Sequence, residues 1–346
     1  MPVRFGRSAL VFALLTPCAC GSAALAQQTP ASAATSQAPT TILTVQSQLV
    51  LVPTEVRTKK GGENIYGLHA EDFTVEADGV PQRVQLDESG APVPLSLVVM
   101  VQCSRTAFRE GPKIRGLATM VDAIVGGGPA KVAVVDFGTE PELLTGLTAD
   151  PDKRDRAFAQ LQPCDDDGGV ATYDAVAYGN EILERAHAPG RRVVLLVSET
   201  RDHGSLSKPD KTIAALNRTN TVVDAVAFSP ARDEVIEDAK TQDGATGGII
   251  GLVLMAVQAL RKNAPKEFAR ETGGEYINFS NEKGFDRSLN TLANRIHNGY
   301  QLSFVPHFPA DSAGSAPGLH ALKVRVPKYP DAVIEHREAY WNGPPQ

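Results

Sequence analysis

Cysteine, excess positive charge and long apolar runs are all scarce in this chain of 346 residues. Its four cysteines are too few for a disulfide framework. Its 34 Lys and Arg against 40 Asp and Glu give a net charge of −6, without the basic excess expected of a nucleic-acid-binding protein. A hydrophobic content of 42% excludes a wholly disordered or collagen-like chain. We therefore expect a globular protein of about two domains with no nucleic-acid partner.

No membrane span is expected, because the apolar run at residues 9–15 is far shorter than the roughly 20 residues that a transmembrane helix needs. This run follows two arginines and leads to the sequence Ala-Leu-Ala ending at Ala26, which is typical of a secretory signal peptide. We predict a signal peptide over residues 1–26, with cleavage near Ala26 and a secreted or periplasmic protein. A lipoprotein signal built on Cys18 or Cys20 is the less favoured alternative, because a proline interrupts both motifs.

The rest of the chain divides into four segments by composition and hydrophobic pattern. Residues 27–40 are rich in Ala, Ser, Thr, Gln and Pro and are predicted to be a disordered tether. Strand-like alternation follows over residues 41–92 and returns over 299–342, whereas residues 93–298 alternate apolar strands with amphipathic helices. Neither flank alone has enough strands for a stable sheet, so we expect the two flanks to pair.

These patterns predict an α/β fold. Repeated βα units indicate a doubly wound, mostly parallel sheet with helices on both faces. We expect this α/β domain to be inserted in a small β-sandwich-like domain that the flanking strands build together. Within the α/β domain we predict strands at residues 97–101, 132–137, 193–197, 222–228 and 276–279, and helices at 113–125, 150–161, 173–186, 212–216, 249–260 and 285–296.

Patterns for catalysis or for a cofactor are incomplete throughout the chain. The sequence has no Gly-x-Ser-x-Gly elbow and no HExxH or His/Cys spacing for zinc. The glycine-rich segment at residues 126–131 leads into a strand and lacks the Gly-Lys-Ser/Thr of a phosphate loop. The acidic run at residues 165–167 is typical of a solvated loop. We therefore predict that the protein is not an enzyme and that it carries no cofactor.

The α/β segment resembles a von Willebrand factor type A (vWA) domain in the order of its elements and in three motifs. Residues 102–106, QCSRT, end the first strand, where the family usually has Asp-x-Ser-x-Ser. Residues 168–175, GGVATYDA, are similar to the family's GGTALYDA, and residues 197–204, VSETRDHG, lie where it has a strand followed by Thr/Ser-Asp-Gly-x-Asp-x-Gly. The flanks, including HAEDFTV at residues 69–75, resemble the secreted VWFA-related proteins common in Acidobacteria.

In that family the three loops usually form a metal-ion-dependent adhesion site, in which hard oxygen ligands surround Mg²⁺. The resemblance implies that Gln102 replaces the first Asp, Val170 replaces the Thr and Glu199 replaces the third-loop Asp. Ser104 and Thr106 keep their hydroxyls. Because one charge and one ligand are lost, we expect a degenerate site with no metal; Mg²⁺ would be a cofactor only if the altered site still binds it.

Two cysteines of the α/β segment fall in the same loops. Cys103 lies in the first loop and Cys164 precedes the second, and in a vWA fold these loops are neighbours. We predict a disulfide between them in a secreted protein. Two free buried thiols are the alternative.

The resemblance implies a secreted, non-enzymatic module for protein binding or adhesion, whose contact surface is the face at the carboxyl ends of the strands. The partner is expected to be an unidentified protein or envelope ligand, and Arg105 could pair with a partner carboxylate where the family uses a metal. An enzyme with an unrecognised site on this face, or a structural envelope component, are the alternatives. The candidate binding residues are Gln102, Ser104, Arg105, Thr106, Asp166, Asp167, Val170, Glu199, Arg201 and Asp202.

Overall fold

A run of eight buried residues forms the centre of the largest sheet in the computed structural model. This strand, β5 (Leu95–Gln102), is buried at every position, as expected of a parallel strand covered on both faces. The sheet has the order β10-β9-β8-β5-β6-β7, in which all neighbours are parallel except β6 and β7. The other strands are β6 (Ala130–Phe137), β7 (Pro141–Thr148), β8 (Arg191–Glu199), β9 (Thr221–Phe228) and β10 (Tyr276–Phe279).

The structure describes residues 49–60, 62–87, 93–104, 107, 116–126, 128–164, 169–228, 263–279, 282–309 and 316–343. All of them belong to one compact unit, Gln46–Gln346. The predicted signal peptide, the tether and the helix predicted at residues 249–260 lie outside the described residues. No helix among the described residues is long and apolar enough to cross a membrane.

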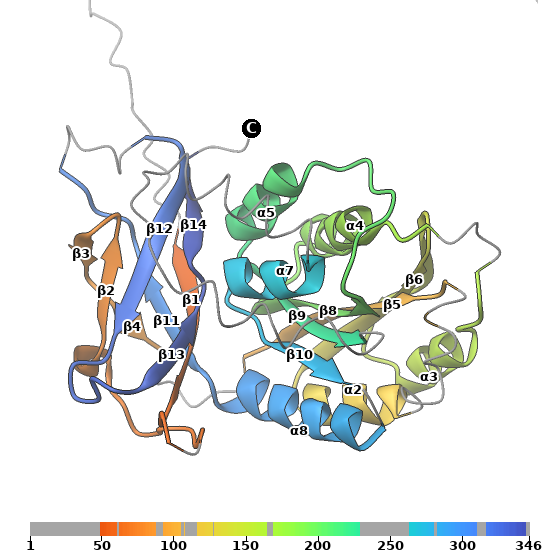
Figure 1. The fold of residues 1–346 in the computed structure, drawn as a ribbon, viewed down its shortest axis with the longest axis horizontal. Helices are drawn as coiled ribbons and strands as arrows, with labels where there is room; N and C mark the ends of the chain where they lie inside the picture. The colour runs from red at the N-terminus through yellow and green to blue at the C-terminus, as the bar shows by residue number, and fades with distance from the viewer. Residues whose placement is uncertain are drawn as a thin grey trace, which may run out of the picture. The chain divides into compact units, whose positions relative to one another are not determined.

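Helices cover both faces of the central sheet (Figure 1). On one face, the odd-numbered residues of β5, such as Leu97 and Val99, pack with apolar side chains of α2 and α8. On the other, Val98 and Met100 pack with those of α4, α5 and α7. The helices are α2 (Leu117–Val125), α3 (Pro151–Ala159), α4 (Thr172–Arg185), α5 (Pro209–Arg218), α7 (Ala264–Thr272) and α8 (Glu282–Asn298).

The flanking segments build two four-stranded antiparallel sheets that share one apolar core. One sheet has the order β13-β1-β11-β4 and the other β14-β12-β2-β3, so each combines strands from before and after the α/β segment. Val52 and Leu302 from the first sheet share a core with Val75, Val324 and Tyr340 from the second. The elements are β1 (Val50–Arg57), η1 (Ala70–Asp72), β2 (Thr74–Ala77), β3 (Val80–Gln82), β4 (Gln85–Leu86), β11 (Tyr300–Phe304), β12 (Gly318–Arg325), β13 (Val333–His336) and β14 (Ala339–Asn342).

The predicted fold class is confirmed: a mostly parallel sheet carries helices on both faces, and the N- and C-terminal strands pair with each other. Within the α/β segment, strand β7 and helix α7 are additional to the prediction. β7 lies at the edge of the sheet, where it contains a glycine and a proline and has no fully buried residue. A strand of this kind lacks the apolar pattern on which sequence-based assignment depends.

A buried arginine links the antiparallel sheets to the α/β segment. Arg337 is 2% exposed and donates hydrogen bonds to the carbonyl oxygen of Leu51 (2.8 Å) and to Oδ1 of Asn220 (2.9 Å). It also donates to Asn217 of α5. A fully buried guanidinium is costly unless its donors are paired, so these contacts define how the segments meet.

We expect Gly274→Ala to destabilise the protein by about 1–3 kcal/mol, because a Cβ at this position would overlap the carbonyl oxygen of Val223 in β9. Gly146→Ala on β7 is the matched control: no atom lies within 4 Å of its added Cβ, so its effect should stay within about 0.5 kcal/mol. Urea unfolding of both variants measures the difference, and equal stability of the two would contradict the close packing of Gly274 on β9.

Candidate functional site

The chain changes direction across the central sheet at β5, so the carboxyl ends of β5 and β8 form a topological switch point, the position at which open α/β sheets have a crevice. β6 lies on one side of β5 and β8 on the other, so the loops leaving the carboxyl ends of β5 and β8 diverge. Open α/β sheets usually bind ligands at such a switch point. Gln102 is the last residue of β5 and Glu199 the last of β8, so two predicted site residues meet there.

The side-chain amide of Gln102 joins three groups of this crevice. Its Oε1 accepts a hydrogen bond from the backbone N–H of Glu199 (2.7 Å). This bond orients the amide so that Nε2 donates to Oγ of Ser104 (2.6 Å) and to Oε2 of Glu199 (3.3 Å). Gln102 is 2% exposed and Ser104 is 1% exposed. A neutral amide therefore binds the predicted carboxylate and hydroxyl together.

Val170 lies near this switch point, and its side chain belongs to the apolar core on the α4 face of the sheet. It is 1% exposed, and its backbone pairs with that of His203 through N–H···O bonds of 3.1 and 2.7 Å. His203 in turn places Nε2 3.4 Å from Oε1 of Glu199. Gln102 thus holds the carboxylate of Glu199 and the hydroxyl of Ser104 together, and Val170 supplies no oxygen at the position where the resemblance predicted a Thr.

A network of side-chain hydrogen bonds shapes the loop after β8. Asp202 accepts bonds from the hydroxyl of Ser205 (2.5 Å) and the backbone N–H of Tyr173 (3.3 Å). Asp174 accepts bonds from the backbone N–H groups of Leu206 (2.8 Å) and Ser207 (2.7 Å). Asp202, a predicted binding residue, therefore has a structural role in anchoring this loop to α4.

The same loop presents exposed side chains. Leu206 is 94% exposed although its backbone is held by Asp174. Arg201, a predicted site residue, is also exposed. Leu206 is not among the predicted site residues, because a single leucine in a polar loop carries no pattern. Its exposure becomes visible only once the hydrogen-bonded loop is known.

The predicted disulfide between Cys103 and Cys164 is confirmed. Their Cα atoms are 5.2 Å apart, and the N–H of Cys164 donates to the carbonyl oxygen of Cys103 (2.9 Å). The bond closes a loop with a sequence separation of 61 residues. In the chain-entropy model a loop of this length contributes about 4 kcal/mol to stability.

Four predicted binding residues, Arg105, Thr106, Asp166 and Asp167, lie outside the described residues. Thr172 is an addition to the predicted set. It begins α4 two residues after Val170, is fully buried, and its hydroxyl has no hydrogen-bond partner among the residues that the structure describes. Nothing in the local sequence distinguishes it from an ordinary helix-start threonine.

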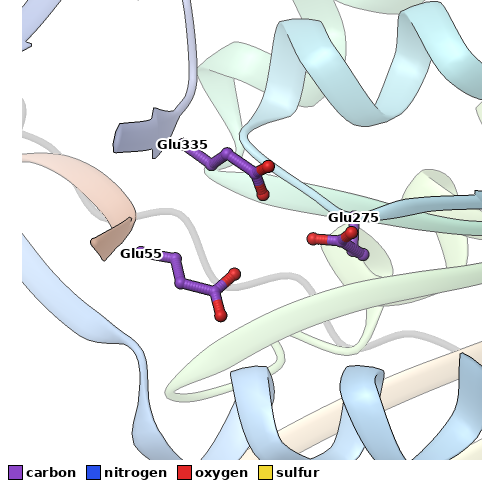
Figure 2. A group of neighbouring side chains, drawn as sticks. All are labelled: Glu55, Glu275 and Glu335. Carbon is purple, nitrogen blue, oxygen red and sulfur yellow. The ribbon is translucent and has the colours of Figure 1, made fainter. Parts of the chain in front are cut away.

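A second cluster of potential metal ligands lies away from this crevice. Glu55, Glu275 and Glu335 each place one carboxylate oxygen within 4.8 Å of the others, and Figure 2 shows their carboxylates turned toward one another. They come from β1, from the turn before β10 and from β13. Three segments distant in the sequence thus contribute one glutamate each.

Two arginines neutralise this cluster. Arg57 pairs with Glu335, and Nε of Arg295 lies 3.5 Å from Glu55 and 3.9 Å from Glu275. Burial, followed by the charge of Glu335, raises the pKa of Glu275 to about 8, although Arg295 acts in the opposite direction. Arg295 is shared between this cluster and Asp224, with which it makes its shortest ion pair, at 2.8 Å. A divalent cation would have to lie next to Arg295, so these residues do not fit a metal site.

No protein-family model and no curated protein matches this chain. Solved structures with a similar fold include proximal thread matrix protein 1 from the mussel byssus, with 13% identity, a TM-score of 0.41, and coverage of 62% of this chain and 48% of that one. A von Willebrand factor type A protein from Catenulispora acidiphila has 13% identity and a TM-score of 0.41, covering 73% and 51%. An aerotolerance-related membrane protein from Bacteroides fragilis has 15% identity and a TM-score of 0.40, covering 59% and 99%.

The chain spans about half the length of the first two of these proteins. The resemblance to the VWFA-related proteins of Acidobacteria stays a prediction. The residues of this chain itself therefore have to indicate its function.

The raised pKa of Glu275 predicts that stability falls as pH rises from about 4.5 to about 8. In this window the folded state keeps a proton that the unfolded state releases, so the stabilisation present below the unfolded pKa is lost as pH passes the folded pKa. Glu275→Gln keeps a neutral donor and cannot ionise, so its advantage over the wild type should grow with pH.

Urea unfolding free energies from pH 5 to 9 measure this difference. Glu181→Gln, on the exposed surface of α4, is the control and should track the wild type across the range. A Glu275→Gln profile parallel to that of the wild type would contradict the bound proton.

Proposed function

We propose that this protein is a secreted, non-enzymatic binding module that contacts a protein or envelope ligand through the face at the carboxyl ends of β5 and β8, without a metal ion. The observation that carries the proposal is the amide of Gln102, which donates to both Ser104 and Glu199. In this arrangement a neutral donor takes the place between hydroxyl and carboxylate that a cation would need.

Electrostatics supports a metal-free site. Mg²⁺ requires near-octahedral oxygen ligands and gives up its water reluctantly. To bind here it would have to displace two hydrogen bonds of the buried Gln102, and Val170 would contribute no oxygen. Among the described residues at the predicted metal-ligand positions (Gln102, Ser104, Val170 and Glu199), Glu199 alone carries a carboxylate. Binding energy must then come from direct contacts between the face and its partner.

The exposed residues of the β8 loop supply such contacts. Leu206 offers an apolar side chain on a backbone that Asp174 holds in place, so little conformational entropy is lost when a partner covers it. Arg201 offers a guanidinium able to pair with a carboxylate. Arg105, which follows the buried Ser104, is proposed to contribute a second guanidinium to the same face.

The geometry favours binding over catalysis. A serine nucleophile needs a base within hydrogen-bond reach. The hydroxyl oxygen of Ser104 accepts bonds from Gln102 (2.6 Å) and from the N–H of Ala107 (3.3 Å), whereas His203 is paired with Glu199. A purely structural envelope role is the remaining alternative, and it does not require the ordered, exposed loop around Leu206.

Calorimetric titration with Mg²⁺, Mn²⁺ and Ca²⁺ should show no binding tighter than millimolar for the wild type. The double variant Gln102→Asp with Val170→Thr restores a charge and a hydroxyl to the crevice, and should bind Mg²⁺ or Mn²⁺ at least tenfold more tightly than the wild type. The single variant Val170→Thr, which lacks the added charge, is the control. Micromolar binding by the wild type would overturn the metal-free site.

Photo-crosslinking tests the binding face directly. A benzophenone amino acid at position 206 should give a discrete adduct with an extracellular or envelope component, and this adduct should persist in EDTA and weaken with Arg201→Ala. The same probe at Tyr66, which is 60% exposed on the β-sandwich side, is the matched control and should give no such adduct. Equal adducts from both positions, or loss of the adduct in EDTA, would contradict the proposal.

A further inference from the structure

A pocket lies at the opposite end of the strands from the candidate binding face. Its lining combines the antiparallel sheet strands β1 and β11 with the amino ends of β8 and β9 and the last turns of α8. Its volume is about 50 Å³. A cavity needs roughly 10–15 Å³ of such volume to hold one water, so this pocket has room for a few waters or one small anion.

The unpaired groups of this pocket are all donors. Nε of Arg191 and Nε2 of Gln301 are buried without a hydrogen-bond partner in the part of the chain that the structure describes. Nε of Arg295 also lacks a hydrogen bond, and its ion pair with Glu55 is long, at 3.5 Å. No buried side-chain oxygen of the described lining residues is left unpaired. The buried side-chain groups of this lining that lack a partner among the described residues are therefore N–H donors.

The charge of the lining is positive. Arg191, Arg192 and Arg295 line the pocket together with the carboxylate of Asp224. Arg295 also pairs with Glu55 and Glu275 outside the lining, so Arg191 is the arginine whose charge the pocket leaves least compensated. Asp224 is already committed, since its Oδ1 accepts from Arg295 (2.8 Å) and from the N–H of Glu275 (2.8 Å). Burial and then the neighbouring Arg295 lower the pKa of Arg191, and the nearby acids Asp87 and Asp224 offset this only in part.

The unpaired donors favour an occupant that accepts hydrogen bonds at several atoms. An oxyanion accepts at every oxygen and brings a negative charge beside Arg191. Hydrogen bonds of a guanidinium to an anion are also stronger than those to a neutral acceptor.

We propose that this pocket binds a small oxyanion, a phosphate, a sulfate or a carboxylate group, through Arg191 and Gln301. Because β11 carries Gln301 and β8 carries Arg191, the bound anion joins the antiparallel sheet to the central sheet. This site is independent of the proposed binding face, from which it is separated by the length of the strands.

Thermal unfolding of the full chain with sodium phosphate, sulfate or acetate tests the proposal, with chloride added to keep ionic strength constant. A saturable rise in Tm is expected for at least one of the three anions, with half-saturation below about 10 mM, and the arms distinguish tetrahedral oxyanions from carboxylates. Sulfate and phosphate also stabilise proteins generally by exclusion from the surface, but that effect does not saturate.

Two variants separate the site from general salt effects. Arg191→Met should weaken the response at least tenfold, whereas Arg185→Met, which removes the same charge from the exposed surface of α4, should leave it unchanged. Gln301→Glu should place a carboxylate beside Arg191, which raises Tm in chloride alone and abolishes the response to added anion. This second variant keeps the test decisive if Arg191→Met does not fold.

A response that needs hundreds of millimolar anion, or that is equal in Arg191→Met and Arg185→Met, would show an adventitious ion only and overturn the proposal. No saturable response to any of the three anions would also overturn it. Because the readout is stability, neither result depends on whether the β8 loop binds a partner.

Discussion

The antiparallel pairing of β1 with β11 is the constraint on which the rest of the structure depends. Val50 lies opposite Phe304 and Thr54 opposite Tyr300, so the whole α/β segment must leave and return at the same place. Gly299 makes the return possible, because a side chain there would collide with the carbonyl oxygen of Arg295 at the end of α8. The buried guanidinium groups of Arg295 and Arg337 then lie where the two parts of the chain meet, and each is held by partners from distant segments.

The two ends of the central sheet have different chemistry as a result. At the carboxyl ends, β5 and β8 contribute polar groups whose hydrogen bonds are made through Gln102. The loop after β8 leaves Leu206 exposed. At the amino ends, the inserted arrangement brings charged residues together from elements far apart in the sequence. There Arg295 is shared among Asp224, Glu55 and Glu275, and Nε of Arg191 has no hydrogen-bond partner among the described residues.

The parts of the fold and site that could be predicted are those set by residues close together in the sequence. The apolar run of β5, the βα alternation and the loop motifs around Gln102 and Glu199 each lie within a few consecutive residues, and the disulfide followed from the placement of these loops in the resembling fold. Groups of residues that come together from distant parts of the sequence could not be predicted. Glu55, Glu275 and Glu335 share no motif, and Arg191 with Gln301 becomes a pair only after β8 and β11 have been positioned. The edge strand β7 was not predicted, because its residues are half-buried or exposed without regular alternation, so the apolar periodicity that indicates a strand is missing.

The disulfide has a consequence for how the protein would come apart. The loop closed by Cys103 and Cys164 contains β6, α2, β7 and α3, which together form the part of the sheet on one side of β5. A protease cut within this loop would leave both fragments covalently joined beside the crevice. Reduction would remove this loop closure, and with it the disulfide's contribution to the free energy of unfolding, while β6 stays paired with β5 along its length. In a reducing environment, the same cut would leave the two fragments held together by noncovalent contacts alone.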